Sequence, residues 1–142
     1  MAWFHRALTI NRELGLVRGT ALQSALAARA LGRLGRFDEA LELLTTARDL
    51  VTGSPAEVLL PKILAGMGAV LTSAGRRDDA ERTLLAAVDQ AVEQGNTADA
   101  ADALITLAKL GGAQSTEYRD RAVRLLERMG SPRAARLLTG SD

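Results

Sequence analysis

The sequence predicts an all-α fold built from stacked antiparallel helix pairs. Two observations predict it, namely a composition rich in helix formers and an internal repeat of 40 residues. The chain has 142 residues, among them 26 alanines and 24 leucines, and both residue types favour helix. Aromatic residues make up only 3% of the chain. Since β-sheets draw on aromatic and β-branched residues, an all-β fold is disfavoured.

The 40-residue repeat is carried by small residues at fixed positions. Gly35 and Gly75 are each followed by Arg and then by an acidic pair and Ala. The third copy starts in register but slips by two residues, so that Ala122 stands where Ala40 and Ala80 stood. Small residues at fixed positions are what two helices need where their backbones approach closely. The small positions are Ala28, Gly68 and Ala108 in the first helix of each pair, and Ala40, Ala80 and Ala122 in the second.

Apolar residues recur every three or four positions, which is the period of an α-helix. Gly35 and Gly75 are expected to end one helix and to permit a tight turn into the next. Ser54-Pro55 and Ser131-Pro132 have the form of a helix start. Pro61 either costs one backbone hydrogen bond inside its helix or marks the true start of that helix. The eight helices expected are 2–14, 18–34, 37–51, 55–74, 77–94, 97–111, 116–129 and 132–139.

These helices are expected to form one domain, and no catalytic chemistry is expected in it. The net charge is +1, with no cysteine and a single histidine, His5, so neither a metal nor another cofactor is expected. The acidic pairs Asp38-Glu39 and Asp78-Asp79 are expected in the first turns of helices, where the macrodipole favours negative charge. The chain has no run of about 20 apolar residues that would span a membrane. We therefore expect a non-enzymatic, cytoplasmic protein.

The expected parts of the domain are a half repeat at 2–17, repeats at 18–53, 54–95 and 96–130, and a C-terminal capping helix at 131–139.

The turn from Leu34 to Ala40, Leu-Gly-Arg-Phe-Asp-Glu-Ala, resembles the tetratricopeptide repeat, and Ala74–Ala80 matches the same pattern more loosely. The resemblance implies a right-handed α-solenoid whose first helices line a concave groove that binds a peptide or protein. The period of 40 exceeds the usual repeat of about 34 residues, so the extended variant is implied.

A narrower resemblance is carried by two N-terminal segments, Arg6–Gly15 and Arg18–Leu22. They are similar to the C-terminal repeats of large actinobacterial antibiotic-regulatory activators, in which a winged-helix part and a nucleotide-binding part come first. This resemblance implies that the chain is the regulatory segment of a bacterial transcriptional regulator. Its partner would be another protein, a peptide, or the upstream domains of the same regulator.

The resemblance also implies which residues line the groove. Four of the twelve implied positions are cations and one is an acid, so an acidic or amphipathic segment would suit the groove, with charge setting approach and orientation. The alternative for Arg29 and Arg33 is that they only solvate the face or pair with neighbouring acids. The twelve positions are Leu22, Ala25, Arg29 and Arg33, then Lys62, Ala65, Ala69 and Ser73, then Asp102, Ile105, Lys109 and Ala113.

A second hypothesis is an architectural array that binds nothing in the groove. Such an array would space or dimerise other domains through Trp3 and Phe4 or through the Leu137-Leu138 end, because the terminal faces of a repeat array lack neighbours. The arginine-rich stretch from Arg119 to Arg136 is interleaved with acids. It is therefore expected to be a solvated helix face, with no contact to nucleic acid or membrane.

Overall fold

The computed structural model describes the backbone of residues 2–139 and, within that range, the side chains of residue 13 and residues 15–139. Over this range the chain is helical and has no strands, which confirms the all-α prediction. The elements are α1 (Ala2–Arg33), α2 (Phe37–Val51), the 3₁₀ helix η1 (Pro55–Leu59), α3 (Leu60–Ser73), α4 (Arg77–Glu93), α5 (Thr97–Lys109), α6 (Ser115–Arg128) and α7 (Arg133–Thr139).

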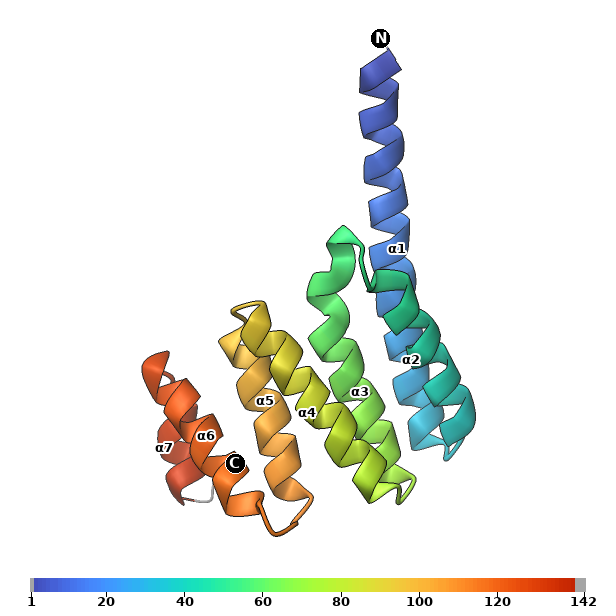
Figure 1. The fold of residues 1–142 in the computed structure, drawn as a ribbon. Helices are drawn as coiled ribbons and strands as arrows, with labels where there is room; N and C mark the ends of the chain where they lie inside the picture. The colour runs from blue at the N-terminus through green and yellow to red at the C-terminus, as the bar shows by residue number, and fades with distance from the viewer. Residues whose placement is uncertain (1, 140–142) are drawn as a thin grey trace.

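The helices pack as neighbouring pairs along the chain. Helix α1 packs against α2, α3 against α4, and α5 against α6, while α7 packs against α6 (Figure 1). The odd-numbered helices also touch one another, since α3 contacts both α1 and α5. Over the described residues α2, α4 and α6 make no contact with one another. The helices therefore lie closer together on the odd-numbered side of the array.

Glycines in the left-handed conformation make the turns between paired helices. Gly35 and Gly75 both have φ of 78°. The amide of Arg36 donates to the carbonyl oxygen of Leu31, and that of Arg76 donates to Leu71, each over 2.9 Å. This six-to-one bond closes a Schellman turn, in which only glycine adopts positive φ at little cost. The predicted helix ends are confirmed at both glycines.

The small residues of the repeat lie where helices meet, as predicted. Ala28, Ala40 and Ala80 are fully buried. A Cβ atom placed on Gly68 of α3 would lie 2.5 Å from Cγ of Leu84 in α4. The α3–α4 crossing is therefore closer than any residue larger than glycine allows without movement.

The N-terminal third of the chain differs from the prediction. Helices were expected at 2–14 and 18–34, but α1 is one continuous helix from Ala2 to Arg33. Gly15 and Gly19 keep negative φ and have no atom within 4 Å of the place of a Cβ. A glycine weakens a helix but does not end it unless it adopts positive φ. The predicted break at residues 15–17 was therefore wrong.

The start of α3 resolves the two alternatives for Pro61. The Ser54 hydroxyl caps η1 by accepting from the amide of Ala56 over 3.1 Å. The 3₁₀ helix ends at Leu59, and α3 follows with Pro61 in its first turn. Pro61 therefore marks the true start of the α-helix, where a missing amide costs nothing.

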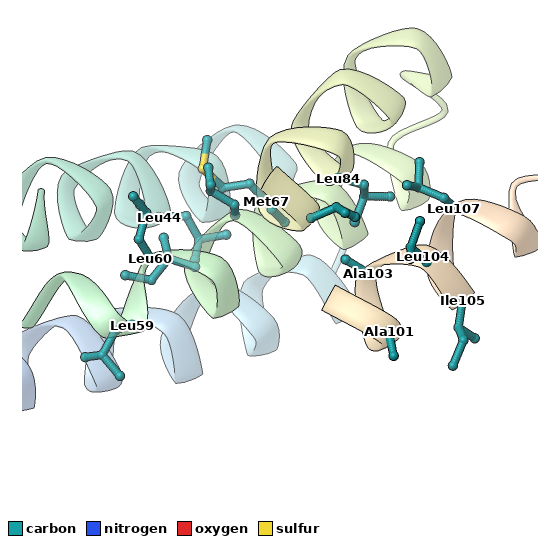
Figure 2. Close-up of a cluster of buried hydrophobic side chains, with 14 of the residues drawn as sticks. Leu44, Leu59, Leu60, Met67, Leu84, Ala101, Ala103, Leu104, Ile105 and Leu107 are labelled. Atoms are coloured by element: carbon teal, nitrogen blue, oxygen red, sulfur yellow. The ribbon is translucent and has the colours of Figure 1, made fainter. Parts of the chain in front are cut away.

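Helix α3 is the centre of the core. It contacts α1, α2, α4 and α5, and Figure 2 shows buried side chains of successive helices, among them Leu44 of α2, Met67 of α3 and Leu84 of α4, meeting around it. The segment Pro55–Ser73 has the length and mean hydropathy, 1.3, of a membrane span, yet 56% of it is buried inside the protein. Such burial is typical of a core helix, and the described residues contain no other segment that passes this test.

Candidate functional site

Eight of the twelve predicted groove positions fall on the exposed side of the odd-numbered helices. The exposed members are seven and then four residues apart in α1 and α3, and seven apart in α5, so those of each helix share one helical face. Because α3 packs between α1 and α5, these three faces are neighbours. We call their exposed residues the odd-helix face. It consists of Leu22, Arg29 and Arg33 of α1, Lys62, Ala69 and Ser73 of α3, and Asp102 and Lys109 of α5.

Three of the predicted positions lie between the helices and not on this face. Ala25 and Ala65 are half-buried, and Ile105 is only 6% exposed and belongs to the core. On the side of α1 that faces α3, a Cβ placed on Gly32 would lie 3.6 Å from Cγ2 of Val70. Ala113 is exposed but lies in the turn after α5. The structure therefore brings together eight of the twelve positions.

The odd-helix face carries cations without acidic partners. Arg29, Arg33, Lys62 and Lys109 are exposed and form no ion pair with any described residue. Neither Arg29 nor Arg33 therefore pairs with an acid within the described part of the chain, and solvation of the face stays as the alternative to partner binding. The face is left with an excess of positive charge.

The one acid among the predicted positions is already engaged. The Asp102 carboxylate accepts from Nη1 of Arg133 over 2.7 Å, which ties α5 to α7. Sequence reasoning missed this pairing, and it also missed Arg18. Arg18 is exposed and lies four residues before Leu22 on the same side of α1. The four-residue spacing to Leu22 was the signal that would have found it.

The acidic pairs are structural, as predicted. Asp38 and Glu39 lie in the first turn of α2, and Asp78 and Asp79 in the first turn of α4. Glu39 pairs with Arg36 over 2.5 Å. At the matching repeat position Asp79 pairs with Arg76 over 2.9 Å.

The hydrogen bond from Arg76, with Arg82 beside it, holds the pKa of Asp79 below its ordinary value. Such a carboxylate is ionised at neutral pH and is a weak base. Asp79 can therefore stabilise the N-terminus of α4 by its negative charge, but it would be a poor general base.

Tyr118 lines a pocket at the irregular turn before α6. Its hydroxyl lies 2.9 Å from Oε1 of Glu81 in α4 and 2.7 Å from Oε1 of Gln114. Burial, together with the hydrogen bond to Glu81, raises the pKa of the Tyr118 phenol. The pocket has a volume of about 220 Å³ and is also lined by Arg77 and Leu107. Since ligand pockets usually measure about 300–1,000 Å³, it is small for an organic ligand.

A second pocket, of about 410 Å³, lies between α6 and α7. Arg119 spans it by donating from Nε and Nη2 to the carbonyl oxygen of Leu137, over 3.1 and 2.5 Å. Two members of the arginine-rich stretch, Arg119 and Arg133, thus hold the last helix in place. Neither pocket is lined by residues of the odd-helix face.

The ends proposed for dimerisation are only partly described. The side chains of Trp3 and Phe4 lie outside the described residues. At the other end Leu137 is buried and Leu138 is exposed. Over the described residues, no three His, Asp or Glu side chains are grouped as a metal site requires.

No protein-family model matches the chain, and no curated protein sequence matches it. Function must therefore be argued from the helical array and from the odd-helix face.

Proposed function

We propose that this chain is a non-catalytic protein-interaction module whose odd-helix face binds an acidic or amphipathic segment of a partner protein. The observation that carries the proposal is the set of exposed cations without acidic partners, Arg29, Arg33, Lys62 and Lys109. A patch of one sign raises the rate at which a segment of opposite sign associates, and it fixes the orientation of that segment.

The small exposed residues of α3 also shape the surface between these cations. Ala69 and Ser73 are exposed between the cation-bearing faces of α1 and α5. Their short side chains leave room for a bound backbone near the helix surface. Leu22 offers an apolar contact on the same face. An amphipathic segment with acidic and apolar residues therefore fits the face better than a purely acidic one.

The likeness of Leu34–Ala40 to the tetratricopeptide turn supports the same reading, and it extends the proposal to a right-handed solenoid. Within this proposal the chain is the regulatory segment of a cytoplasmic bacterial transcription regulator. Its odd-helix face would contact another protein or the upstream domains of the same regulator. It would not itself contact DNA.

Peptide display tests the proposal directly. Peptides selected from a random library on the wild-type chain are measured against Arg29→Glu with Lys62→Glu. Reversing two interfacial charges is expected to weaken binding by about 1–3 kcal/mol, or roughly 5- to 150-fold, if the peptides bind this face. The matched control is Arg124→Glu with Arg128→Glu, which makes the same charge change on exposed residues of α6. Equal losses of affinity in both double variants, or no loss in Arg29→Glu with Lys62→Glu, would show that the peptides do not bind the odd-helix face.

A further inference from the structure

The outward sides of α2 and α4 carry acids that pair with no described cation. In α4, Ala80, Leu84 and Ala87 are buried in the core, and helical periodicity places Asp89 and Glu93 on the opposite side. These acids are exposed and form no ion pair with any described residue. We call the set the even-helix face, which consists of Asp38 and Glu42 of α2 and Asp78, Asp89 and Glu93 of α4.

The odd-numbered side of the array carries the opposite charge. Beside Arg29, Arg33 and Lys62 of the odd-helix face, Arg18 is also exposed and forms no ion pair within the described part of the chain. Helices α2 and α4 pack against the odd-numbered helices, so the two charged faces lie on different sides of the array. One molecule therefore cannot bring its own two faces together, whereas two molecules can. Such a contact between unlike surfaces of identical chains is heterologous.

The unpaired charges of α1 and α4 have the same spacing. Three cations of α1 and three acids of α4 follow one another at intervals of 11 residues and then 4. A helix rises about 1.5 Å per residue, so each set spans about 22 Å. Two parallel helices in contact therefore bring all three opposite charges to the same heights. The three pairs are Arg18 with Asp78, Arg29 with Asp89, and Arg33 with Glu93.

We infer that the odd-helix face of one copy of this chain binds the even-helix face of a second copy, with α1 of the first parallel to α4 of the second. The inference rests on the proposed function, because it names the partner of the odd-helix face. The charge complementarity of the two faces carries it, and both faces are solvent-exposed in the single chain.

The same arrangement brings α3 of the first copy over α2 of the second. Lys62 stands in α3 where Leu22 stands in α1, and Glu42 stands in α2 where Arg82 stands in α4, because the repeat is 40 residues long. Lys62 therefore lies opposite Glu42. Arg82, which is held by Asp79 of its own helix, lies opposite the uncharged Leu22. No two like charges face each other across these four helices.

The size of the contact sets the strength expected. Two helices about 10 Å wide, in contact over about 22 Å, cover on the order of 450 Å² per copy. The total of about 900 Å² lies in the range of weak, transient complexes. Exposed ion pairs contribute little when salt screens them. The association is therefore weak, reversible and strongest at low salt.

Sedimentation equilibrium at protein concentrations up to about 1 mM, which detects weak association, tests the inference. In about 10 mM salt, where charges interact over about 30 Å, wild-type protein is expected to associate at least tenfold more tightly than in about 1 M salt. Arg29→Glu with Arg33→Glu places like charges against Asp89 and Glu93, and is expected to weaken association at least tenfold. Wild-type protein that stays monomeric at low salt overturns the inference.

A charge exchange tests the pairing itself. Adding Asp89→Arg and Glu93→Arg to the double-Glu variant exchanges the charges of both pairs and returns the net charge to the wild-type +1. This exchange is expected to restore association at least tenfold.

The matched control adds Glu117→Arg and Glu127→Arg instead, which gives the same net charge through exposed acids of α6 outside both faces. It should restore nothing. Circular dichroism verifies that each variant folds, which is expected because every changed residue is exposed. Equal association of the exchange variant and the control would show that the proposed pairs do not form.

The two proposals can fail separately. If wild-type protein stays monomeric while selected peptides still require Arg29 and Lys62, the odd-helix face binds acidic segments but its partner is not a second copy. If the charge exchange restores association while peptide binding ignores Arg29 and Lys62, the faces of two copies pair and the peptide-binding proposal is wrong.

Discussion

At the scale of single residues, the contact between Gly68 and Leu84 sets how closely α3 and α4 pack. Gly68→Ala would bring a Cβ within 2.5 Å of Leu84 Cγ and 2.6 Å of its Cδ2. We expect unfolding in urea to show a loss of about 1–3 kcal/mol, the usual cost of overpacking a core. Gly66→Ala is the control, because its nearest neighbour, a methyl carbon of Leu44, lies at 3.5 Å. That change should stabilise α3 by about 0.5–1 kcal/mol through helix propensity. Equal effects at both positions would contradict the close crossing.

The Tyr118 phenol gives a pH-dependent prediction. Its pKa is raised in the folded protein, so the folded state holds the proton more tightly than the unfolded state. This contribution to stability is complete below the unfolded pKa of about 10. It is lost as the pH rises from there through the folded pKa. Tyr118 is the only tyrosine, so the ultraviolet absorbance of its phenolate reports this titration alone.

Glu81→Gln removes the carboxylate beside Tyr118 and should lower the pKa of the phenol towards its ordinary value. Burial, together with the nearby negative charge of Glu117, would then maintain whatever shift of the pKa remains. Glu93→Gln, at an exposed residue of the same helix, is the control and should leave the titration unchanged. If the Tyr118 phenol of the wild-type protein titrates with a midpoint at or below about pH 10, neither burial nor Glu81 raises its pKa.

At the scale of elements, the sequence predicted the helices that end in a local signal. Gly35 and Gly75 end α1 and α3 because a Schellman turn needs positive φ, and the glycine itself supplies it. The helix break predicted at residues 15–17 does not occur, because no glycine there adopts the positive φ that such a turn needs. Gly15 and Gly19 keep helical backbone angles, and glycine spacing alone does not distinguish a tolerated helix glycine from a terminating one.

The candidate site was predictable only in part. The repeat places Leu22, Lys62 and Asp102 on exposed helix faces, because helical periodicity fixes which residues share a side. It did not predict that Ile105 is buried or that Asp102 pairs with Arg133. Both depend on tertiary neighbours that no local pattern encodes.

At the scale of the whole molecule, stability is expected to be uneven along the array. Helix α3 touches four other helices, whereas the N-terminal half of α1 extends past the rest of the protein (Figure 1). In a linear array each unit is stabilised only by its neighbours. Opening therefore costs little at the ends and approaches the global unfolding free energy in the centre.

Native-state hydrogen exchange measures this gradient. Amides from Ile63 to Leu71 in α3 are expected to exchange slowest, and those of residues 5–13 at least about a hundredfold faster, because opening free energies fall towards zero at unsupported ends. Gly68→Ala strains the central crossing and should raise exchange in α3 and α4 more than in α6. If residues 5–13 were as protected as α3 in dilute protein, contacts beyond those of the helical array would be holding them.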